Sequence, residues 1–484
     1  MSAMDFRPVF LIIGILVSTL ALFMCLPAIV DLFAGHKDWE VFALSAGVTL
    51  FVGVAMALAS NTSGKQFSIR QAFLMTTLSW IMLTVFAALP FAYSELDMTF
   101  TDAFFEAMSG LTTTGSTVIV GLDTAPPGIL LWRALLQWVG GIGIIVMAIA
   151  ILPMLRVGGM QLFRMESSEK SEKALPRAAQ VASAIGVIYL LLTGIWVIAY
   201  WFAGMSGFDA VAHAMTTIAT GGFSTRDASF GAFDSPAIHT IATIGMFVGA
   251  LPFVLYLRTI QGSWSALLRD SQVRWFSVVV LLAVATATAW LWLDNGRSFL
   301  DALSASAFNV ISIITGTGYV SEDYTRWGAF SIPLFFFIMF IGGCAGSTTC
   351  GIKVFRFQVL YAAAWTQMRH LLQPHGIFVP YYNHRPIEDD VIVSVLSFFF
   401  VFGVCYALLA LGLGMMGLSF LGAISGAATA ISNVGPSLGP ITGPSGTFDN
   451  IPDGAKWLLS GGMLLGRLEL FTVLVLFTRT FWRA

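Results

Sequence analysis

Long apolar runs separated by short polar stretches recur along the whole chain. Each run approaches or exceeds the ~20 residues that a helix needs to cross the hydrocarbon core of a bilayer. The runs predict ten membrane-spanning helices, at 8–30, 39–60, 71–93, 128–154, 180–204, 237–258, 274–293, 329–357, 391–416 and 455–480. The expected fold is therefore an all-α, polytopic membrane protein.

Four further apolar stretches are too short to cross the bilayer. They lie between predicted spans, at about 101–113, 208–220, 300–315 and 419–432. Non-helical backbone enters a membrane only where protein buries it or a water-filled cavity hydrates it. Four re-entrant half-helices of this kind predict a central aqueous pathway.

The ends of these four stretches carry the same glycine loop. The loops read Leu111-Thr-Thr-Thr-Gly-Ser-Thr117, Ile218-Ala-Thr-Gly-Gly-Phe-Ser224, Ile314-Thr-Gly-Thr-Gly-Tyr-Val320 and Ile431-Ser-Asn-Val-Gly-Pro-Ser437. Internal repetition of this kind defines an architecture. It predicts an extra N-terminal helix pair at 1–66 and four pore repeats of span, pore loop and span, with fourfold pseudosymmetry, at 67–157, 158–262, 263–372 and 373–484.

Glycine loops at the ends of half-helices suit the passage of potassium. An ion that loses its water in a narrow pore needs oxygen ligands, and rings of backbone carbonyls supply them. Half-helices that run inward also direct their partly negative C-terminal ends at the ion. The predicted potassium ligands are the backbone carbonyls of Thr113, Thr114, Gly115, Thr220, Gly221, Gly222, Thr315, Gly316, Thr317, Gly318, Asn433, Val434 and Gly435. Simple turns between membrane helices are the alternative for any single loop, but four loops in register favour a selectivity filter.

Composition and charge agree with a membrane protein and assign its sides. Of the 484 residues, 57% are hydrophobic and only 10% are charged, where soluble domains have about 25% charged residues. A net charge of -2 gives no basic surface for nucleic acid. If both termini are cytoplasmic, 17 of the 24 Lys and Arg residues lie on the cytoplasmic side, as short loops require, and 17 of the 26 acidic residues lie outside.

The outer acidic residues include Asp102, Asp123, Asp209, Asp301, Glu322 and Asp323. Together they predict an outer mouth that attracts cations. The sequence shows no catalytic constellation and no dinucleotide-binding glycine motif, so neither an enzyme nor a bound cofactor is expected, and potassium enters as the substrate.

Two features lie below the predicted filter. The eighth span contains small and hydroxyl residues, namely Gly342, Gly343, Gly346, Ser347, Thr348 and Thr349. They favour a broken helix that enters the pore, although close helix packing is the alternative. Arg467 lies inside the tenth span, where an ionisable side chain indicates function, and there it would oppose the passage of a cation.

The four loops, the fourfold repeat and the two additional N-terminal spans resemble the Trk/Ktr/HKT superfamily of potassium transporters, with the bacterial TrkH/TrkG potassium-uptake subunits as the most similar branch. The resemblance extends over nearly the whole chain. It implies that the residues from Gly342 to Thr349 form an intramembrane gating loop and that Arg467 is a pore arginine. It also implies a homodimer in the bacterial inner membrane and a cytosolic TrkA-type partner that binds NAD(H) and ATP or ADP.

The expected function is potassium uptake through a gated, channel-like pore. A proton- or sodium-coupled potassium symporter is the alternative, in which an intramembrane carboxylate moves with the substrate. Glu469 is the one clear carboxylate within a predicted span. An enzyme or structural membrane protein without a pore is the alternative from another class.

Overall fold

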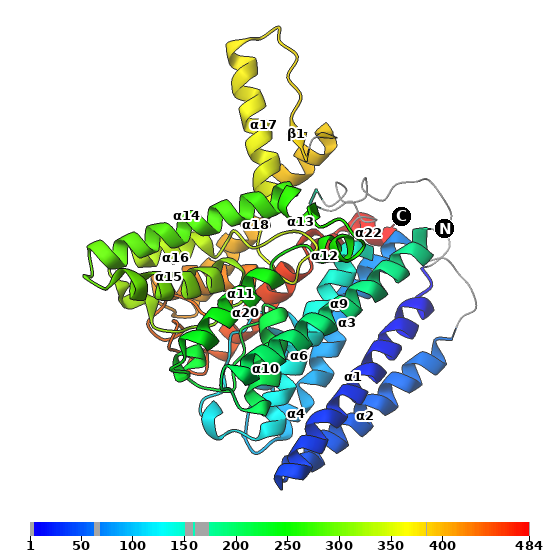
Figure 1. The fold of residues 1–484 in the computed structure, drawn as a ribbon. Coiled ribbons are helices and arrows are strands. Elements are labelled where there is room, and N and C mark those ends of the chain that lie inside the picture. Colours follow the sequence, from blue (N-terminus) through cyan, green and yellow to red (C-terminus); the bar gives the residue numbers. More distant parts are fainter. Residues whose placement is uncertain (1–3, 62–67, 151–157, 160–173, 384, 484) are drawn as a thin grey trace.

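The structure, a computed structural model, describes residues 4–61, 68–150, 158–159, 174–383 and 385–483. This part of the chain is mostly helical (Figure 1). Seven of its segments are long and apolar enough to cross a membrane as continuous spans: α1 (Arg7–Ala34), α2 (Asp38–Ala59), α3 with α4 (Ile69–Ala87, Leu89–Tyr93), α6 (Pro127–Ala150), α9 (Ala174–Phe202), α14 (Ser271–Leu293) and α18 (Asp389–Met415). The chain is thus a multi-pass membrane protein.

The predicted spans 237–258 and 455–480 are bent and not continuous. The first consists of α11 (Pro236–Gly249) and α12 (Phe253–Ile260), which meet at 92°. Pro252 lies at this break, where its ring and missing N–H cannot continue a helix. The second consists of α20 (Asp453–Arg467), α21 (Phe471–Leu474) and η4 (Val475–Phe477), with a bend of 106°.

The predicted span 329–357 has the broken-helix form. Helix α16 (Ser331–Ile338) ends early, and an irregular segment leads to α17 (Val354–Leu372). Positive φ angles at Gly342, Gly346 and Gly351, from 69 to 77°, prevent a helix there. The prediction of uninterrupted spans is therefore wrong at 237–258 and 455–480, whereas the span 329–357 has the break that its small and hydroxyl residues favour. The end of the span 128–154 and the repeat boundaries at 66, 67 and 157 lie outside the described residues.

The four short stretches are helices that begin in the same way. They are α5 (Phe100–Leu111), α10 (Gly207–Ile218), α15 (Phe299–Ile314) and α19 (Phe420–Ser432). Each is preceded by a Ser or Thr whose side chain accepts a hydrogen bond from the backbone N–H three residues later: Thr99, Ser206, Ser298 and Ser419. Such a cap satisfies a backbone donor that the helix leaves unpaired. The shared helix start is a second sign of the fourfold repeat.

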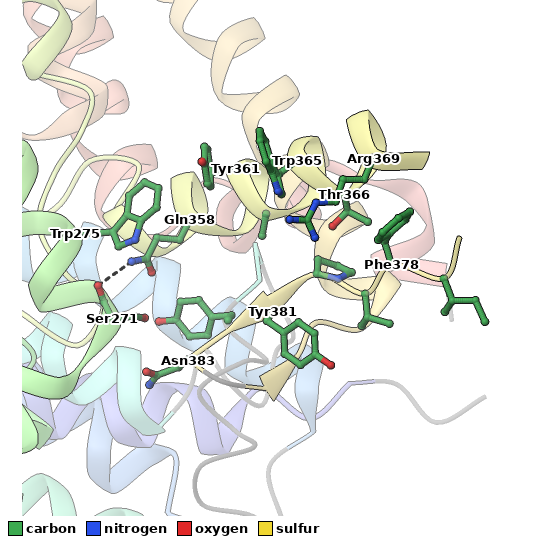
Figure 2. A pocket seen from close by; sticks show the side chains of 15 residues that line it. Ser271, Trp275, Gln358, Tyr361, Trp365, Thr366, Arg369, Phe378, Tyr381 and Asn383 are labelled. Atoms are coloured by element: carbon green, nitrogen blue, oxygen red, sulfur yellow. Dashed lines mark hydrogen bonds between the residues drawn. The ribbon is translucent and has the colours of Figure 1, made fainter. Parts of the chain in front are cut away.

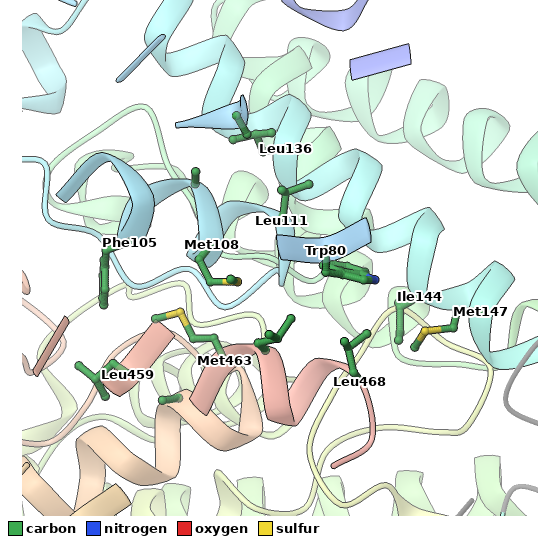
Figure 3. Packing of buried hydrophobic residues seen from close by; sticks show 14 of the residues in the cluster. Trp80, Phe105, Met108, Leu111, Leu136, Ile144, Met147, Leu459, Met463 and Leu468 are labelled. Carbon is green, nitrogen blue, oxygen red and sulfur yellow. The ribbon is translucent and has the colours of Figure 1, made fainter. Parts of the chain in front are cut away.

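Glycines of α6 let two half-helices approach closely. A methyl group on Gly140 would overlap the carbonyl of Leu111 at the end of α5, and one on Gly141 would lie 3.1 Å from the Cα of Ala219, next to the end of α10. Figure 3 shows Met108 of α5 next to Met463, and Trp80 between Leu111 and Leu468, all in one buried cluster. Membrane helices associate through such close contacts because lipid provides little hydrophobic driving force.

Helix α17 projects away from the helical body on the side where both termini lie (Figure 1). The chain returns from it through a short antiparallel pair, β1 (Tyr381–Tyr382) and β2 (Arg385–Pro386). A cavity of about 560 Å³ lies between α14, α17 and the returning strand, with aromatic side chains around it (Figure 2). The remaining short elements are η1 (Leu122–Thr124), η2 (Ser229–Ala232), α13 (Ala266–Arg269), η3 (Tyr324–Trp327) and α22 (Arg479–Arg483).

Candidate ion pathway

The four glycine loops close into a ring. A methyl group on Gly115 would overlap the carbonyl oxygen of Gly221 in the second loop. The second loop meets the third in the same way, the third meets the fourth, and the fourth meets the first. In each case a methyl group on the glycine would lie less than 3.0 Å from a carbonyl oxygen of the next loop: Gly222 with Thr317, Gly318 with Val434, and Gly435 with Thr114. We call these eight residues the glycine ring, and Gly115, Gly222, Gly318 and Gly435 the four glycines of the ring. Its closure places the four loops around one axis.

The four loops also share one backbone conformation. The glycines of the ring have φ angles from 83 to 109°, and the residues two positions earlier, Thr113, Thr220, Gly316 and Asn433, have φ angles from 48 to 70°. Left-handed geometry costs an L-residue about 1–2 kcal/mol, so Thr113 and Thr220 hold strained backbone. Strain of this kind persists where the surrounding structure enforces it, commonly at functional sites. Thr315 directly follows α15, and its hydroxyl donates to the carbonyl of Ile311 at 2.7 Å.

One cavity touches all four glycines of the ring. It has a volume of about 70 Å³ and lies on the side of the residues that follow the glycines, including Ser116, Thr117, Ser224 and Pro436. A water molecule needs roughly 10–15 Å³ of such space. The cavity therefore has room for several water molecules directly against the ring.

The segment from Gly342 to Thr349 lies beneath the second loop. The hydroxyl of Thr348 is 3.1 Å from the carbonyl of Ile218, at the end of α10, and it accepts a hydrogen bond from the hydroxyl of Thr220 at 3.0 Å. The backbone N–H of Thr348 donates to the carbonyl of Gly249 at the break after α11. Ser347 and Thr349 bond one another at 2.8 Å and shape the segment from within. The predicted intramembrane loop thus contacts the base of the glycine ring.

Arg467 binds this loop with its guanidinium group. It donates to the carbonyl of Thr348 at 3.2 Å and to the carbonyl of Gly140 in α6 at 2.7 Å, and only 1% of the residue is exposed. A methyl group on the preceding residue, Gly466, would overlap the carbonyl of Ile431 at the base of the fourth loop. The arginine therefore lies between the intramembrane loop and the lower end of the ring.

This geometry agrees with known proteins over almost the full length of the chain. A sequence model of TrkH, described as a cation transport protein, matches residues 40–483. The chain belongs to the TrkH family.

Two curated relatives and one solved structure illustrate the similarity. The chain is 46% identical over 477 residues to the Trk system potassium uptake protein TrkI of Halomonas elongata, covering 98% of this chain and 97% of that protein. It is 39% identical over 485 residues to the Trk system potassium uptake protein TrkH of Escherichia coli, covering 99% and 100%. The crystal structure of the potassium transporter TrkH from Vibrio parahaemolyticus matches with a TM-score of 0.92 at 36% identity, covering 99% of this chain and 100% of that chain.

In this member of the TrkH family, side chains of the half-helices form hydrogen bonds with the residues that follow the four glycines of the ring. Glu106, nine residues before Gly115, accepts hydrogen bonds from the Thr117 hydroxyl at 3.0 Å and from the Val118 N–H at 2.9 Å. At the matching positions, His213 contacts Ser224 at 3.0 Å and Asn309 donates to Ser321 at 2.7 Å. The fourth repeat has Gly426 there, and the adjacent Ser425 accepts from the Leu438 N–H instead. These residues explain how diverged repeats keep one loop shape.

Glu106, Arg133 and Gln137 were not singled out from the sequence, but the structure places them in contact with the loops. Arg133 and Gln137 face the second loop from α6, with contacts to the carbonyls of Ser224 and Gly221 at 2.7 and 2.5 Å. Both are polar residues within the predicted apolar span 128–154, which is itself an indication of function in a membrane. That signal was sufficient to find them.

Most of the acidic residues predicted for the outer mouth are paired with basic side chains. Among the six named for the predicted mouth, five lie within 4 Å of a basic side chain: Asp102 with Lys456, Asp123 and Asp209 with Arg226, Glu322 with Arg297, and Asp323 with Arg326. Asp301 instead accepts from the Ser298 hydroxyl at 2.6 Å. Because most of these charges are compensated, the field of the mouth is weaker than the acidic count predicts.

Glu469 of the broken tenth span has two basic partners, both at the end of the intramembrane loop. Its carboxylate bonds the guanidinium of Arg356 and lies 3.5 Å from the ammonium of Lys353. All three side chains are at most 5% exposed. One carboxylate therefore compensates two buried cations and joins the loop to the tenth span.

We expect Glu469→Gln to destabilise the protein, because it leaves two buried cations without a counter-charge. Loss of one partner of a buried pair costs about 3–5 kcal/mol. The measurement is the apparent thermal unfolding midpoint of the purified protein in detergent. Glu322→Gln is the matched control, since its pair with Arg297 is about one-third exposed and such pairs contribute about 0–1 kcal/mol. Equal midpoints for the two variants would contradict the assigned role of Glu469.

Proposed function

We propose that this chain takes up potassium ions through a pore whose narrowest part is the glycine ring. The observation that carries the proposal is the cyclic contact of each ring glycine with the carbonyl of the next loop. It brings four carbonyl-rich segments from distant parts of the chain around one axis, at the ends of four half-helices. The names of the relatives, which are potassium uptake proteins and a potassium transporter, support potassium as the ion.

The proposed pathway has three parts in sequence. Hydrated ions collect in the cavity against the ring, lose water to the backbone carbonyls of the thirteen predicted ligand residues, and then meet the intramembrane loop. The loop and Arg467 form the proposed gate. An arginine that binds the loop from below adds a positive charge on the path of the ion, which raises the barrier for a cation.

The proposal also covers the side of the membrane on which the termini lie and the proteins with which the chain assembles. The repeats 67–157, 158–262, 263–372 and 373–484 each contribute one loop, and both termini lie in the cytoplasm of a bacterial cell with the protein in its inner membrane. A homodimer and a cytosolic TrkA-type partner that binds NAD(H) and ATP or ADP follow from the family resemblance. The exposed aromatic side of α17, with Tyr361 and Trp365 about half exposed, offers surface for protein contacts.

Coupled symport is the second candidate function, and the contacts of Glu469 count against it. A coupling carboxylate must exchange its proton or sodium ion during transport. Glu469 is instead paired with Arg356 and Lys353, and loss of its charge during transport would leave both buried cations without a counter-charge.

Flux measurements in liposomes separate these functions. For a potassium channel, the reversal potential of the purified protein is expected to follow the potassium gradient alone. A reversal potential that shifts with pH or with the sodium gradient would establish coupling and overturn the channel proposal. Absence of any cation flux, with and without a cytosolic partner, would favour a protein without a pore.

We expect Gly115→Ser to reduce discrimination between potassium and sodium. A side chain at this position would displace the Gly221 carbonyl, which belongs to the ring. The measurement is the permeability ratio from bi-ionic reversal potentials. Gly121→Ser is the matched control, because Gly121 has almost the same φ angle, 83° against 84°, and open space around it apart from Thr124 at 3.7 Å. Unchanged selectivity in Gly115→Ser would exclude the first loop from the filter.

We expect Arg467→Ala to increase the rate of potassium flux, because it removes a positive charge and the hydrogen bond that holds the Thr348 carbonyl. Loss of about 1.4 kcal/mol from the barrier would raise the rate tenfold. Initial rates of potassium efflux from liposomes measure this effect. A folded variant with an unchanged or lower rate would contradict a role of Arg467 as a barrier.

A further inference from the structure

The four loops of the glycine ring are braced in two different ways. The first and third loops carry a pair of threonines on either side of the left-handed residue. The hydroxyls of Thr112 and Thr114 lie 2.7 Å apart, and those of Thr315 and Thr317 lie 2.8 Å apart. Thr112 and Thr315 already donate to carbonyls of their own half-helices. Thr114 and Thr317 therefore donate within each pair, and both loops hold their shape internally.

The second loop has no such pair. Ala219 and Gly221 occupy the two positions, and neither has a hydroxyl. The second loop contains two glycines, Gly221 and Gly222, as the third loop does with Gly316 and Gly318, but without the threonine pair that holds the third loop. By its own sequence, the second loop is the least constrained part of the ring.

Gln137 of α6 supplies the missing brace from outside the loop. Its side-chain N–H donates to the carbonyl of Gly221 at 2.5 Å, and its side-chain oxygen accepts from the N–H of Phe223 at 3.0 Å. Gln137 is fully buried. A methyl group on Gly221 would overlap the Gln137 amide, so the missing side chain of Gly221 is what admits it.

The fourth loop, which also lacks the threonine pair, is likewise braced by an amide. Asn433 donates to the hydroxyl of Thr114 and to the carbonyl of Met463, both at 2.9 Å. Loops that brace themselves thus alternate with loops that an amide braces. The difference between them is that Asn433 donates to a side-chain hydroxyl of the ring and to a carbonyl outside it, whereas Gln137 donates to a backbone carbonyl of the ring itself.

We infer that Gln137 is a positioning residue that sets ion selectivity by holding the Gly221 carbonyl. This inference rests on the proposed role of the ring as a potassium filter. The Gly221 oxygen is the atom that faces Gly115 in the ring, and it is the same atom that receives the amide hydrogen of Gln137. The Phe223 N–H, which donates to the side-chain oxygen of Gln137, fixes the orientation of the amide. The amide in turn fixes the position of the Gly221 carbonyl.

The expected consequence follows from the sizes of the ions. Sodium is smaller than potassium, so carbonyl ligands must move inward to contact it. A carbonyl bound to a buried amide resists that movement, and the shared lone pair also weakens it as a ligand, which disfavours the ion that needs the stronger field. Removal of the amide hydrogen bond should therefore favour sodium more than potassium.

Gln137→Met tests this inference, because methionine has a similar length and no N–H donor. We expect the potassium-to-sodium permeability ratio in liposomes to fall by roughly fivefold, the factor that corresponds to a hydrogen bond of about 1 kcal/mol. Gln358→Met is the matched control. Gln358 is a buried glutamine that donates to the carbonyl of Ser271 at 2.9 Å, in contact with the aromatic cavity of Figure 2 and away from the ring, and its variant should keep the ratio of the unmodified protein.

Gln137→Glu provides a second variant of the same size. The ratio is measured at alkaline pH, where the carboxyl is ionised; the carboxylate can then accept from the Phe223 N–H but cannot donate to the Gly221 carbonyl, so we expect the ratio to fall here as well. A folded Gln137→Met or Gln137→Glu protein with an unchanged ratio would overturn the inference. If the unmodified protein itself does not discriminate between the two ions, the proposed filter fails, and this outcome is distinct from a failure of the Gln137 assignment alone.

Discussion

No side chain fits between neighbouring loops of the glycine ring. Each of the four glycines faces the carbonyl oxygen of the next loop, at a distance that excludes even a methyl group. The same loops have left-handed backbone at each glycine and two positions before it, and the contacts between loops bring the ends of the four half-helices together around the ring. The shared Ser or Thr caps and the side chains that support the outgoing segments maintain that arrangement in repeats whose sequences have otherwise diverged.

One face of helix α6 contacts successive parts of the proposed pathway. Arg133, Gln137 and Gly140 follow one another at helical spacing and contact, in turn, the carbonyl of Ser224, the carbonyl of Gly221 and the guanidinium of Arg467. The hydrophobic effect contributes little to helix association within lipid, so such polar contacts and close glycine packing hold the pathway together. Helix α6 therefore supplies side-chain partners to the second loop, so the four loops share a backbone conformation but differ in the side chains around them.

The sequence predicted the repeated parts of this structure and missed the contacts that join them. Apolar periodicity located the spans, and the register of the glycines located the ring, because both patterns recur within the chain. Hydropathy could not detect the breaks after Gly249 and Arg467, since the residues on both sides remain apolar. The partners of Glu469 are also beyond local reasoning, because Arg356 lies 113 positions earlier in the chain. The acidic count overestimated the field of the outer mouth for the same reason: compensation by Arg226 or Lys456 depends on distant contacts.

Polar contacts join the intramembrane loop to other parts of the proposed pathway. Thr348 contacts the base of the second loop, its carbonyl accepts from Arg467, and Lys353, four residues after the loop, lies 3.5 Å from the carboxylate of Glu469. Buried polar groups that lose a partner carry a cost of about 1–3 kcal/mol each unless water replaces it. Movement of the loop away from the ring must therefore admit water to these groups. In the proposed pore, opening of the path would therefore coincide with its hydration, and the hydrogen bond between Thr220 and Thr348 would couple this change to the second loop of the ring.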